Sequence, residues 1–345
     1  MRIQIQVISV IAIVGAILWC FVVLARPPAG DWLLHVSYDP TRELYRAMNK
    51  AFIADYFDRT GKKIAIRQSH SGSAGQARAV NEGLPADVVS LAIPPDLDSV
   101  AGSGFVASDW RDQQPHRATP FYSTIVFVVR AGNPKGVRDW DDLTRSDDGL
   151  QIVTPNPKTS GNGKLSLLAA WGAAVRRGCS TEEADIVVKG VLAKAPVLDA
   201  SARAATATFA QKKIGDVHLT FESEAVLEVG ESREGLEIIY PASGSLRVEP
   251  PIALVDRNAR RRRTTELADE YLKFIFSPAG QRIGASLFYR PSDPLIAREF
   301  EGRLPKATMF KLEDVGIDWK IAQERFFSSG ALIDRIAEEL AGVKR

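Results

Sequence analysis

Short apolar runs alternate along the chain with stretches in which apolar residues recur at helical spacing. The runs have the length and composition of buried strands, and the stretches between them have the periodicity of helices that pack on a sheet. This alternation predicts an α/β fold with mostly parallel sheets and helices on both faces. The expected strands are residues 33–38, 63–68, 87–93, 123–130, 150–155, 216–222, 236–241 and 250–256. A helix is expected over Thr265–Phe276, and a helical segment from about Asp318 onward.

An apolar run from Val7 to Ala25 precedes these elements and follows Arg2. It is long for a signal-peptide core and just long enough to span a membrane. Residues 1–30 are therefore expected to be either a signal peptide or an N-terminal membrane anchor. A lipoprotein is not favoured, because bulky Trp19 stands before Cys20. In either case the rest of the chain is expected to work outside the cytoplasm.

The length of 345 residues is enough for two α/β lobes, each with its own core. Two polar, proline-containing stretches, residues 113–120 and 241–250, are suited to connect the lobes. Two crossings would make the first lobe discontinuous. The expected division is 31–118 plus 242–297 for lobe 1, 119–241 for lobe 2, and 298–345 for a C-terminal helical segment that packs on the lobes.

Composition narrows the classes of partner. The chain has 44 Lys and Arg against 42 Asp and Glu, so its net charge of +2 does not indicate a nucleic-acid partner. Its four histidines and two cysteines are scattered, and their spacing predicts neither a metal site nor a disulfide framework. No cofactor is expected, and chemistry based on ATP or NAD is not expected outside the cytoplasm.

Several expected strands lead directly into helices, and ligands of α/β sheets gather at such turns. The turns are residues 36–43, 68–77, 155–164 and 199–206, and they are rich in Ser, Gly and Ala. In the first, Asp39 and Pro40 are suited to be the N-cap and the first helical residue. The free amides of a helix N-terminus can hold an oxyanion. The alternative is that these are ordinary capped helices and Gly-rich turns.

Two catalytic patterns fail at these turns. Ser71 stands where a nucleophile elbow requires glycine. Lys158 and Leu165 break the phosphate-loop pattern. His70 is expected to be a structural or hydrogen-bonding residue, because no partner for catalysis stands near it in the sequence.

Two charged groups elsewhere are expected to be solvated. Glu222 and Glu224 are two residues apart at the end of a predicted strand, so they would share one strand face. The run Arg260–Arg263 has no interleaved aromatic residues and predicts an exposed loop.

Five sequence blocks resemble, in order, blocks of the periplasmic sulfate- and thiosulfate-binding proteins of ABC importers. The resemblance extends from about Leu33 to the C-terminus. It implies a two-lobed, type II periplasmic binding fold, with an oxyanion held in the interlobe cleft by amides and hydroxyls and touched by no cation. The blocks are VSYDPTREL (36–44), QSHSGSAGQA (68–77), NPKTSGNGK (156–164), the block at 205–225 and FYRPSDP (288–294).

The resemblance also implies roles for individual residues. Ligand contacts would come from Ser73 in lobe 1 and from lobe 2. Asp39 and Lys164 would form a peripheral acid–base pair, although the family often has arginine in place of Lys164. Phe221 stands where the sulfate binders have tryptophan and where thiosulfate-type members have phenylalanine. The implied ligand-binding residues are Ser73, Ser160, Gly161, Asn162, Ala202 and Phe221, and the supporting residues are Asp39, Lys164, Gly163 and Ser71.

These observations together predict a solute-binding protein that captures sulfate or thiosulfate and delivers it to a membrane permease. It is expected to be a monomer and not an enzyme. One alternative is a membrane-tethered oxyanion sensor or scaffold on the same fold. Another is a secreted serine hydrolase using Ser73 or Ser160, but no histidine or metal cluster accompanies either serine.

Overall fold

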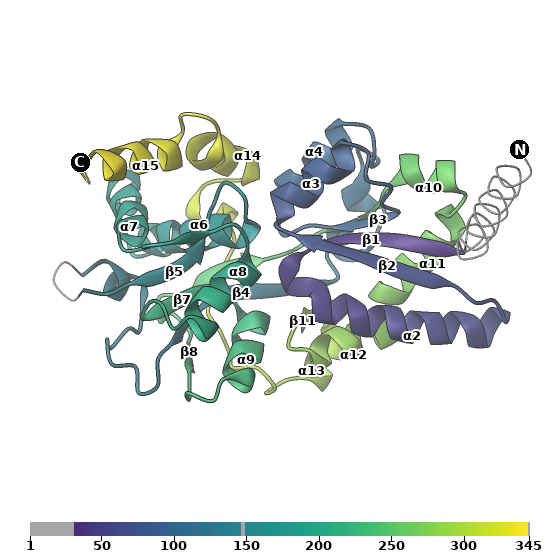
Figure 1. Ribbon diagram of the computed structural model, residues 1–345, viewed down its shortest axis with the longest axis horizontal. Helices are drawn as coiled ribbons and strands as arrows, with labels where there is room; N and C mark the ends of the chain where they lie inside the picture. The colour runs from purple at the N-terminus through teal and green to yellow at the C-terminus, as the bar shows by residue number, and fades with distance from the viewer. Residues whose placement is uncertain (1–30, 146–148, 344–345) are drawn as a thin grey trace, which may run out of the picture.

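The computed structural model describes residues 31–145 and 149–343. The expected signal peptide or anchor, residues 1–30, lies outside the described residues. Within them, no helix combines the length and the apolar character needed to cross a membrane. The described chain forms two lobes side by side along its longest axis, with the beginning of the chain on one lobe and the C-terminal helix on the other (Figure 1).

Lobe 1 is built on a sheet with the strand order β10-β3-β1-β2. β1 pairs in parallel with β2 and β3, and β10 pairs antiparallel with β3. Leu33 and Val36 of β1 point to opposite faces, where each joins a separate core. α2 and α11 cover one face, and α3 and α4 cover the other. The bounds are β1 (Trp32–Tyr38), α2 (Arg42–Thr60), β2 (Ala65–Ser71), α3 (Ser73–Asn81), β3 (Val88–Ser90), α4 (Pro94–Gly102), β10 (Ile252–Leu254), α10 (Asp256–Arg262), α11 (Thr265–Phe276), α12 (Pro278–Ser286) and α13 (Pro294–Glu299).

Lobe 2 has a larger sheet with the order β12-β9-β4-β7-β5-β6, and β8 and β11 also pair with β4. α6 and α7 contribute to the core on one face, and α8 and α9 to that on the other. The bounds are β4 (Phe121–Val129), β5 (Ile152–Pro155), α6 (Gly161–Arg176), α7 (Thr181–Ala193), β6 (Leu198–Asp199), α8 (Ala202–Thr206), β7 (Val217–Phe221), α9 (Glu222–Glu231), β8 (Glu237–Ile239), β9 (Ser245–Val248), β11 (Arg290–Pro291) and β12 (Met309–Phe310).

The predicted α/β class and its two-lobed arrangement are confirmed, with one difference in detail. The second sheet is mixed rather than mostly parallel, because central β4 pairs antiparallel with β7, β8, β9 and β11. The chain comes from lobe 1 when it forms β4. Within the described residues, no helical crossover from another strand of the same sheet precedes β4, and such a crossover is what makes neighbouring strands parallel. Just before it, His116, Arg117 and Ala118 have φ of 54°, 55° and 59°, and this left-handed turn directs the chain across.

The return crossing lies later than the expected boundary at residue 242. β9 (Ser245–Val248) still pairs with β4, so the chain leaves lobe 2 only after Val248. β11, also expected in lobe 1, pairs with the first residues of β4. The division of the chain into lobes otherwise stays a proposal.

The C-terminal segment packs mainly on lobe 2. Phe326, Ile333 and Ile336 are buried in the core that also contains α6 and α7. α14 (Trp319–Ala322) also contacts α4 of lobe 1. A π-helical turn (Gln323–Phe327) and α15 (Leu332–Val343) follow it. Other short turns are Asp39–Thr41, Trp110–Asp112, Pro115–Ala118, Trp140–Thr144, Ala207–Gln211 and Glu313–Val315.

Three local predictions are wrong. Asp39 is the first residue of a 3₁₀ turn whose N-cap is Tyr38, so it is not itself the cap. Glu222 and Glu224 lie in the first turn of α9 rather than on a strand, because β7 ends at Phe221, and both are buried rather than solvated. The run Arg260–Arg263 is no loop, since its first three residues form the end of α10.

Candidate functional site

A small cavity lies between the lobes, where the carboxyl ends of several strands meet the starts of the following helices. Its volume is about 10 Å³, which is close to the room that one water molecule needs. All six predicted ligand-binding residues line it, as do Asp39 and Ser71, whereas Gly163 and Lys164 do not. The lining residues are Tyr38, Asp39, Pro40, Ser71, Gly72, Ser73, Ala92, Ser160, Gly161, Asn162, Ala202 and Phe221.

Helix starts dominate the lining. α3 begins at Ser73, α6 at Gly161, α8 at Ala202, and α9 directly after Phe221. The first amides of a helix have no partner within it, and a side-chain cap usually satisfies one of them. α3, α6 and α9 have no side-chain cap, whereas Ser201 caps α8 through the amide of Ala204. The cavity is therefore surrounded by N–H donors and by the positive ends of helix dipoles.

The side chains of the lining polar residues are used differently. The Ser73 hydroxyl donates to Asp96 Oδ2 at 2.5 Å and accepts from the Ala92 amide at 2.9 Å, so only the Ser73 amide is free for a ligand. The Asn162 side chain donates to the Leu219 carbonyl oxygen, which leaves its backbone N–H. The Ser160 hydroxyl has no hydrogen-bond partner among the described residues, so Ser160 can offer a side-chain donor.

Two glycines allow the lobes to approach each other around the cavity. A Cβ on Gly161 of lobe 2 would lie 2.4 Å from the Ala92 Cβ of lobe 1. A Cβ on Gly72 of lobe 1 would lie 2.6 Å from the Thr159 carbonyl oxygen of lobe 2. Gly163 allows a close approach within lobe 2 instead. A Cβ at this position would lie 2.3 Å from the Pro155 carbonyl oxygen.

No lysine, arginine or histidine is among the residues that line the cavity. α6 carries one buried lysine in its first turn, Lys164. Its Nζ lies 3.8 Å from Asp96 Oδ1, across the boundary between the lobes. Burial lowers the pKa of Lys164 and raises that of Asp96. Asp39 forms its ion pair with Arg42 instead, at 3.8 Å. The expectation that Asp39 and Lys164 pair with each other is therefore wrong, because α4 brings a second carboxylate to the lysine.

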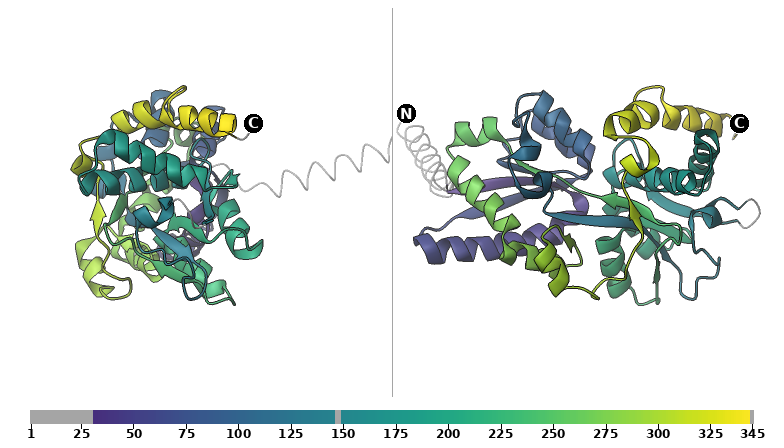
Figure 2. Two further views of the ribbon diagram at one scale, coloured as in Figure 1. Left: turned by 90° about the vertical axis from the view of Figure 1, so that its left-hand side faces the viewer. Right: turned by 180° about the vertical axis from the view of Figure 1, so that it is seen from behind.

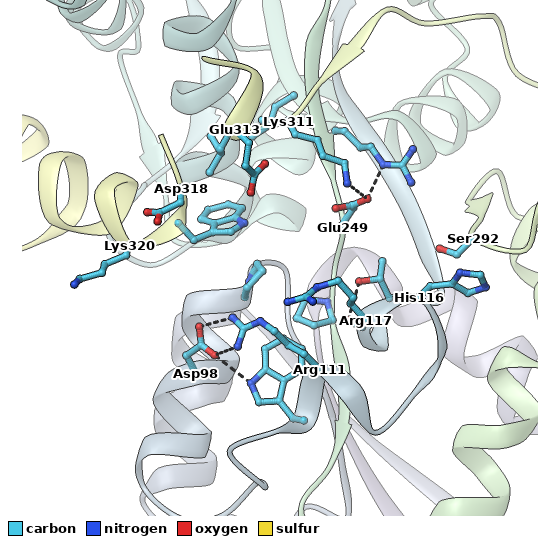
Figure 3. A pocket seen from close by; sticks show the side chains of 18 residues that line it. Asp98, Arg111, His116, Arg117, Glu249, Ser292, Lys311, Glu313, Asp318 and Lys320 are labelled. Atoms are coloured by element: carbon cyan, nitrogen blue, oxygen red, sulfur yellow. Dashed lines mark hydrogen bonds and ion pairs between the residues drawn. The ribbon is translucent and has the colours of Figure 1, made fainter. Parts of the chain in front are cut away.

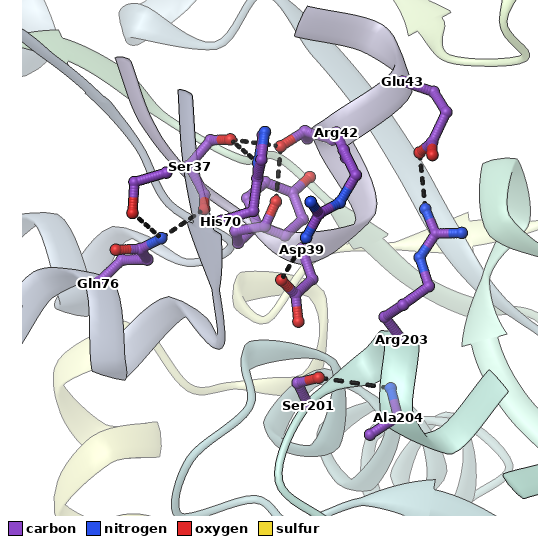
Figure 4. A network of polar contacts seen from close by, with 12 residues as sticks. Ser37, Asp39, Arg42, Glu43, His70, Gln76, Ser201, Arg203 and Ala204 are labelled. Atoms are coloured by element: carbon purple, nitrogen blue, oxygen red, sulfur yellow. Dashed lines mark hydrogen bonds and ion pairs between the residues drawn. The ribbon is translucent and has the colours of Figure 1, made fainter. Parts of the chain in front are cut away.

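A second charged contact crosses the lobes at the edge of the site. Arg203, next to Ala202 on α8, donates to Glu43 on α2 at 2.6 Å (Figure 4). The same guanidinium lies 3.7 Å from Glu224, which is buried. Burial raises the pKa of Glu224 to about 8, although Arg203 opposes the shift. The other carboxylate of this turn, Glu222, accepts two hydrogen bonds of 2.7 Å from Arg290.

His70 has the hydrogen-bonding role expected of it. Its Nδ1 lies 2.8 Å from the Ser37 hydroxyl, which in turn accepts from Thr41 (Figure 4). Burial lowers the pKa of His70 to about 4, so the ring is neutral at pH 7. The histidine therefore adds no charge near the cavity.

Phe221 gives the cavity one apolar wall. It is 2% exposed, and its ring meets that of Tyr38 edge to face with a centroid distance of 5.9 Å. Both rings also line a second small cavity, of about 10 Å³, which is rich in hydroxyl groups. Phe221 thus separates two buried spaces.

Sequence reasoning missed several residues of the site. Tyr38, Pro40, Gly72 and Ala92 line the cavity, and Asp96 connects Ser73 with Lys164. The sequence did hold a signal for Ala92 and Asp96. The expected strand at 87–93 is followed by two prolines and Asp96, which is another strand-to-helix turn.

The arrangement suits reversible binding. Among the residues of 31–145 and 149–343, no group of His, Cys, Asp and Glu side chains could hold a metal ion. The donors converge from both lobes on one small cavity. Fold and site together define a two-lobed binding protein with a small cavity between helix N-termini.

Comparisons with known proteins agree with this class. The family model of bacterial extracellular solute-binding proteins matches residues 38–290. The sulfate-binding protein of Escherichia coli K12 is 42% identical over 308 residues, which cover 89% of this chain and 93% of that protein. The thiosulfate-binding protein of Pseudomonas aeruginosa PAO1 is 43% identical over 310 residues, or 89% and 92% of the two chains.

The fold is also similar to that of a solved structure over most of the chain. The sulfate-binding protein SubI from Mycobacterium tuberculosis H37Rv matches with a TM-score of 0.78 and 29% identity, covering 86% of this chain and 99% of that one. The chain belongs to the bacterial extracellular solute-binding proteins. Its described lobes therefore work outside the cytoplasm.

Proposed function

We propose that this protein captures sulfate or thiosulfate in the periplasm and delivers it, as a monomer, to the permease of an ABC transporter. The observation that carries this proposal is the cavity itself, which is lined by uncapped helix N-termini and by no cationic side chain. Relatives of similar length that bear the names of sulfate- and thiosulfate-binding proteins support it. These relatives also favour binding over catalysis and over a sensor role.

In this proposal the residues that line the cavity are the ones that bind the anion. The amides of Ser73, Gly161, Asn162 and Ala202 donate to the anion, and Ser160 adds its hydroxyl. A fully ionised oxyanion accepts at every oxygen, so it matches a shell of donors. A protonated oxyanion also carries an O–H group, which is a hydrogen-bond donor and needs an acceptor. A buried donor without an acceptor costs on the order of 1 to 3 kcal/mol, roughly a ten- to hundredfold loss of affinity.

Calorimetric titration of the purified protein tests the proposal. Sulfate, thiosulfate and selenate should each bind with one anion per chain and without added metal. Hydrogen phosphate should bind much more weakly. The proposal fails if no tetrahedral dianion binds, or if binding requires a metal ion. Tight binding of hydrogen phosphate would mean instead that the cavity offers its proton an acceptor, for which the lining residue Asp39 is the candidate.

Phe221 is expected to affect the choice between the two anions. Its ring offers hydrocarbon where an indole would donate a hydrogen bond, and the net worth of one such bond is about 0.5 to 1.5 kcal/mol. The larger, weakly accepting sulfur of thiosulfate tolerates this contact better than an oxygen does. Phe221→Trp should shift the affinity ratio toward sulfate several-fold in competition titrations. An unchanged ratio would mean that position 221 does not face the anion.

The N-terminal run belongs to the same proposal. We infer that residues 1–30 direct export and that they are either cleaved or kept as an anchor. Mass spectrometry of the protein from its host decides between these: an N-terminus near Arg26 means cleavage, and an intact Met1 in the membrane fraction means retention.

A further inference from the structure

Arginines gather at the end of lobe 1 where the chain enters the fold. Arg257, Arg260 and Arg261 on α10, Arg263 just after it, and Arg67 on β2 are all exposed. We call these five residues the arginine tip. α10 lies at the same end of the long axis as the start of β1, and α15 lies at the opposite end (Figures 1 and 2).

Trp32, the first residue of β1, contacts Arg67 of the arginine tip and also Arg262, the α10 residue between Arg261 and Arg263 that is not itself part of the tip. The Arg262 guanidinium lies 3.8 Å from the centre of the Trp32 ring, and that of Arg67 lies 4.5 Å from it. Arg262 also donates to the Trp32 carbonyl oxygen and pairs with buried Asp87. The tip is thereby fixed to the point where residues 1–30 join the fold.

Most of the charge of the arginine tip is not neutralised. Arg260 lies 3.7 Å from Asp256. Within the described residues, Arg67, Arg257, Arg261 and Arg263 form no ion pair. Glu266, on the first turn of α11, is an exposed carboxylate close by in the sequence. Even with Glu266 and Asp256 counted, the surface carries excess positive charge.

Local structure accounts for these arginines only in part. Arg260 and Arg261 stand in the last turn of α10, and the Arg257 guanidinium lies 4.9 Å from the centre of the Phe105 ring. Cations stabilise the last turn of a helix, but Arg257 stands in the first turn of α10, where the dipole disfavours it. Arg263 has φ of 59°, in the left-handed region that favours glycine or asparagine. Both positions suggest that the charge serves something outside the fold.

The chain that precedes the described residues suggests the partner. The apolar run ends at Ala25, and the steps from there to Asp31 span at most about 20 Å when fully extended. If the run is retained in the membrane, the arginine tip is held close to the lipid headgroups. We infer that the arginine tip contacts the anionic headgroups of the membrane that holds the N-terminal run, and so sets the orientation of lobe 1.

The test uses the full chain, reconstituted in vesicles of neutral phosphatidylcholine or of phosphatidylcholine with anionic phosphatidylglycerol. The rate at which phenylglyoxal modifies each arginine is measured by mass spectrometry. Arg261 and Arg263 should react at least roughly fivefold more slowly on the anionic vesicles, as expected for cations at an anionic surface. The difference should disappear at high salt. Arg335, exposed on α15 at the far end, is the internal control and should react at one rate on both vesicles.

A variant provides the second readout. With Arg257→Gln, Arg260→Gln and Arg263→Gln combined, the protection of the remaining Arg261 and Arg67 should be lost, while anion binding in the distant cavity is unchanged. Equal modification rates on the two kinds of vesicle would overturn the inference. Equal protection of Arg335 would also overturn it, as would recovery of the protein from its host only in soluble form, beginning after Ala25.

Discussion

Two hollows of this molecule differ in size and in charge, and the smaller one has the features of a binding site. The groove in Figure 3 has a volume of about 830 Å³ and lies between lobe 1, the return crossing and the C-terminal segment. It contains several arginines and lysines, but many already have carboxylate partners. Arg111 donates twice to Asp98 at 2.7 Å, and Glu249 accepts from Arg247 and lies 3.3 Å from Lys311.

The interlobe cavity has the opposite properties. It is small and has no cation in its wall, yet it collects uncapped helix N-termini from both lobes. If the cavity holds the anion, as we propose, then neither volume nor a count of basic side chains identifies the site. Donors without internal partners do, because only they gain a bond when the anion enters.

The largest change should come from keeping the lobes apart. Gly161→Ala places a methyl group 2.4 Å from the Ala92 Cβ, so α6 must withdraw from lobe 1. Overpacking of this kind costs about 1 to 3 kcal/mol, which is roughly a 5- to 150-fold loss of anion affinity by calorimetry. Gly230→Ala, which has no heavy atom within 4 Å of its new methyl group, is the matched control and should bind normally. Equal affinities in the two variants would contradict the close approach at Gly161.

The next largest effect should come from the free hydroxyl in the cavity wall. Ser160→Ala removes a donor that has no partner inside the described protein, and the loss should be about 1 kcal/mol, roughly fivefold in affinity. Ser71→Ala, at an exposed lining residue where water can replace the hydroxyl, should change the affinity less. Titration of both variants checks this order, and the reverse order would show that Ser160 does not face the anion.

A smaller effect is expected at the edge of the site. Glu43→Gln breaks the contact with Arg203 that joins the two lobes, and exposed pairs of this kind contribute about 0.2 to 1 kcal/mol. The anion should dissociate up to about fivefold faster in stopped-flow measurements. Lys189→Gln, which breaks an ion pair between α7 and α15, is the control and should leave dissociation unchanged.

The smallest effect should come from the groove. Arg111→Gln with Lys311→Gln removes two cations whose carboxylate partners lie beside them, so the anion affinity should change less than about twofold. Titration at two salt concentrations measures it. A tenfold loss would mean that the groove, rather than the cavity, holds the anion.

Local signals explain what the sequence could predict. Serine and glycine after an apolar run indicated the starts of α3 and α6, and the bounds Thr265–Phe276 of α11 are those the periodicity predicts. All the predicted ligand-binding residues line one cavity. Their roles as ligands are still predictions.

What could not be predicted depends on contacts between distant segments. Lys164 finds Asp96 only because α4 and α6 meet across the lobes. The direction of β4 relative to its neighbours is not encoded in its apolar pattern, so the mixed sheet was not foreseen. For Glu222 and Glu224 a signal existed, because carboxylates are favoured in the first turn of a helix.

The division of donors between the lobes has a consequence for unloading. Ser73 belongs to lobe 1, whereas Gly161, Asn162 and Ala202 belong to lobe 2. If these residues hold the anion as we propose, separation of the lobes alone would strip one part of the shell from the anion and admit water to the remainder. A transporter that pulls the lobes apart therefore needs no competing group of its own to empty the cavity. Release of the anion then depends on the separation of the lobes, and its rate is set by the contacts that hold the lobes together.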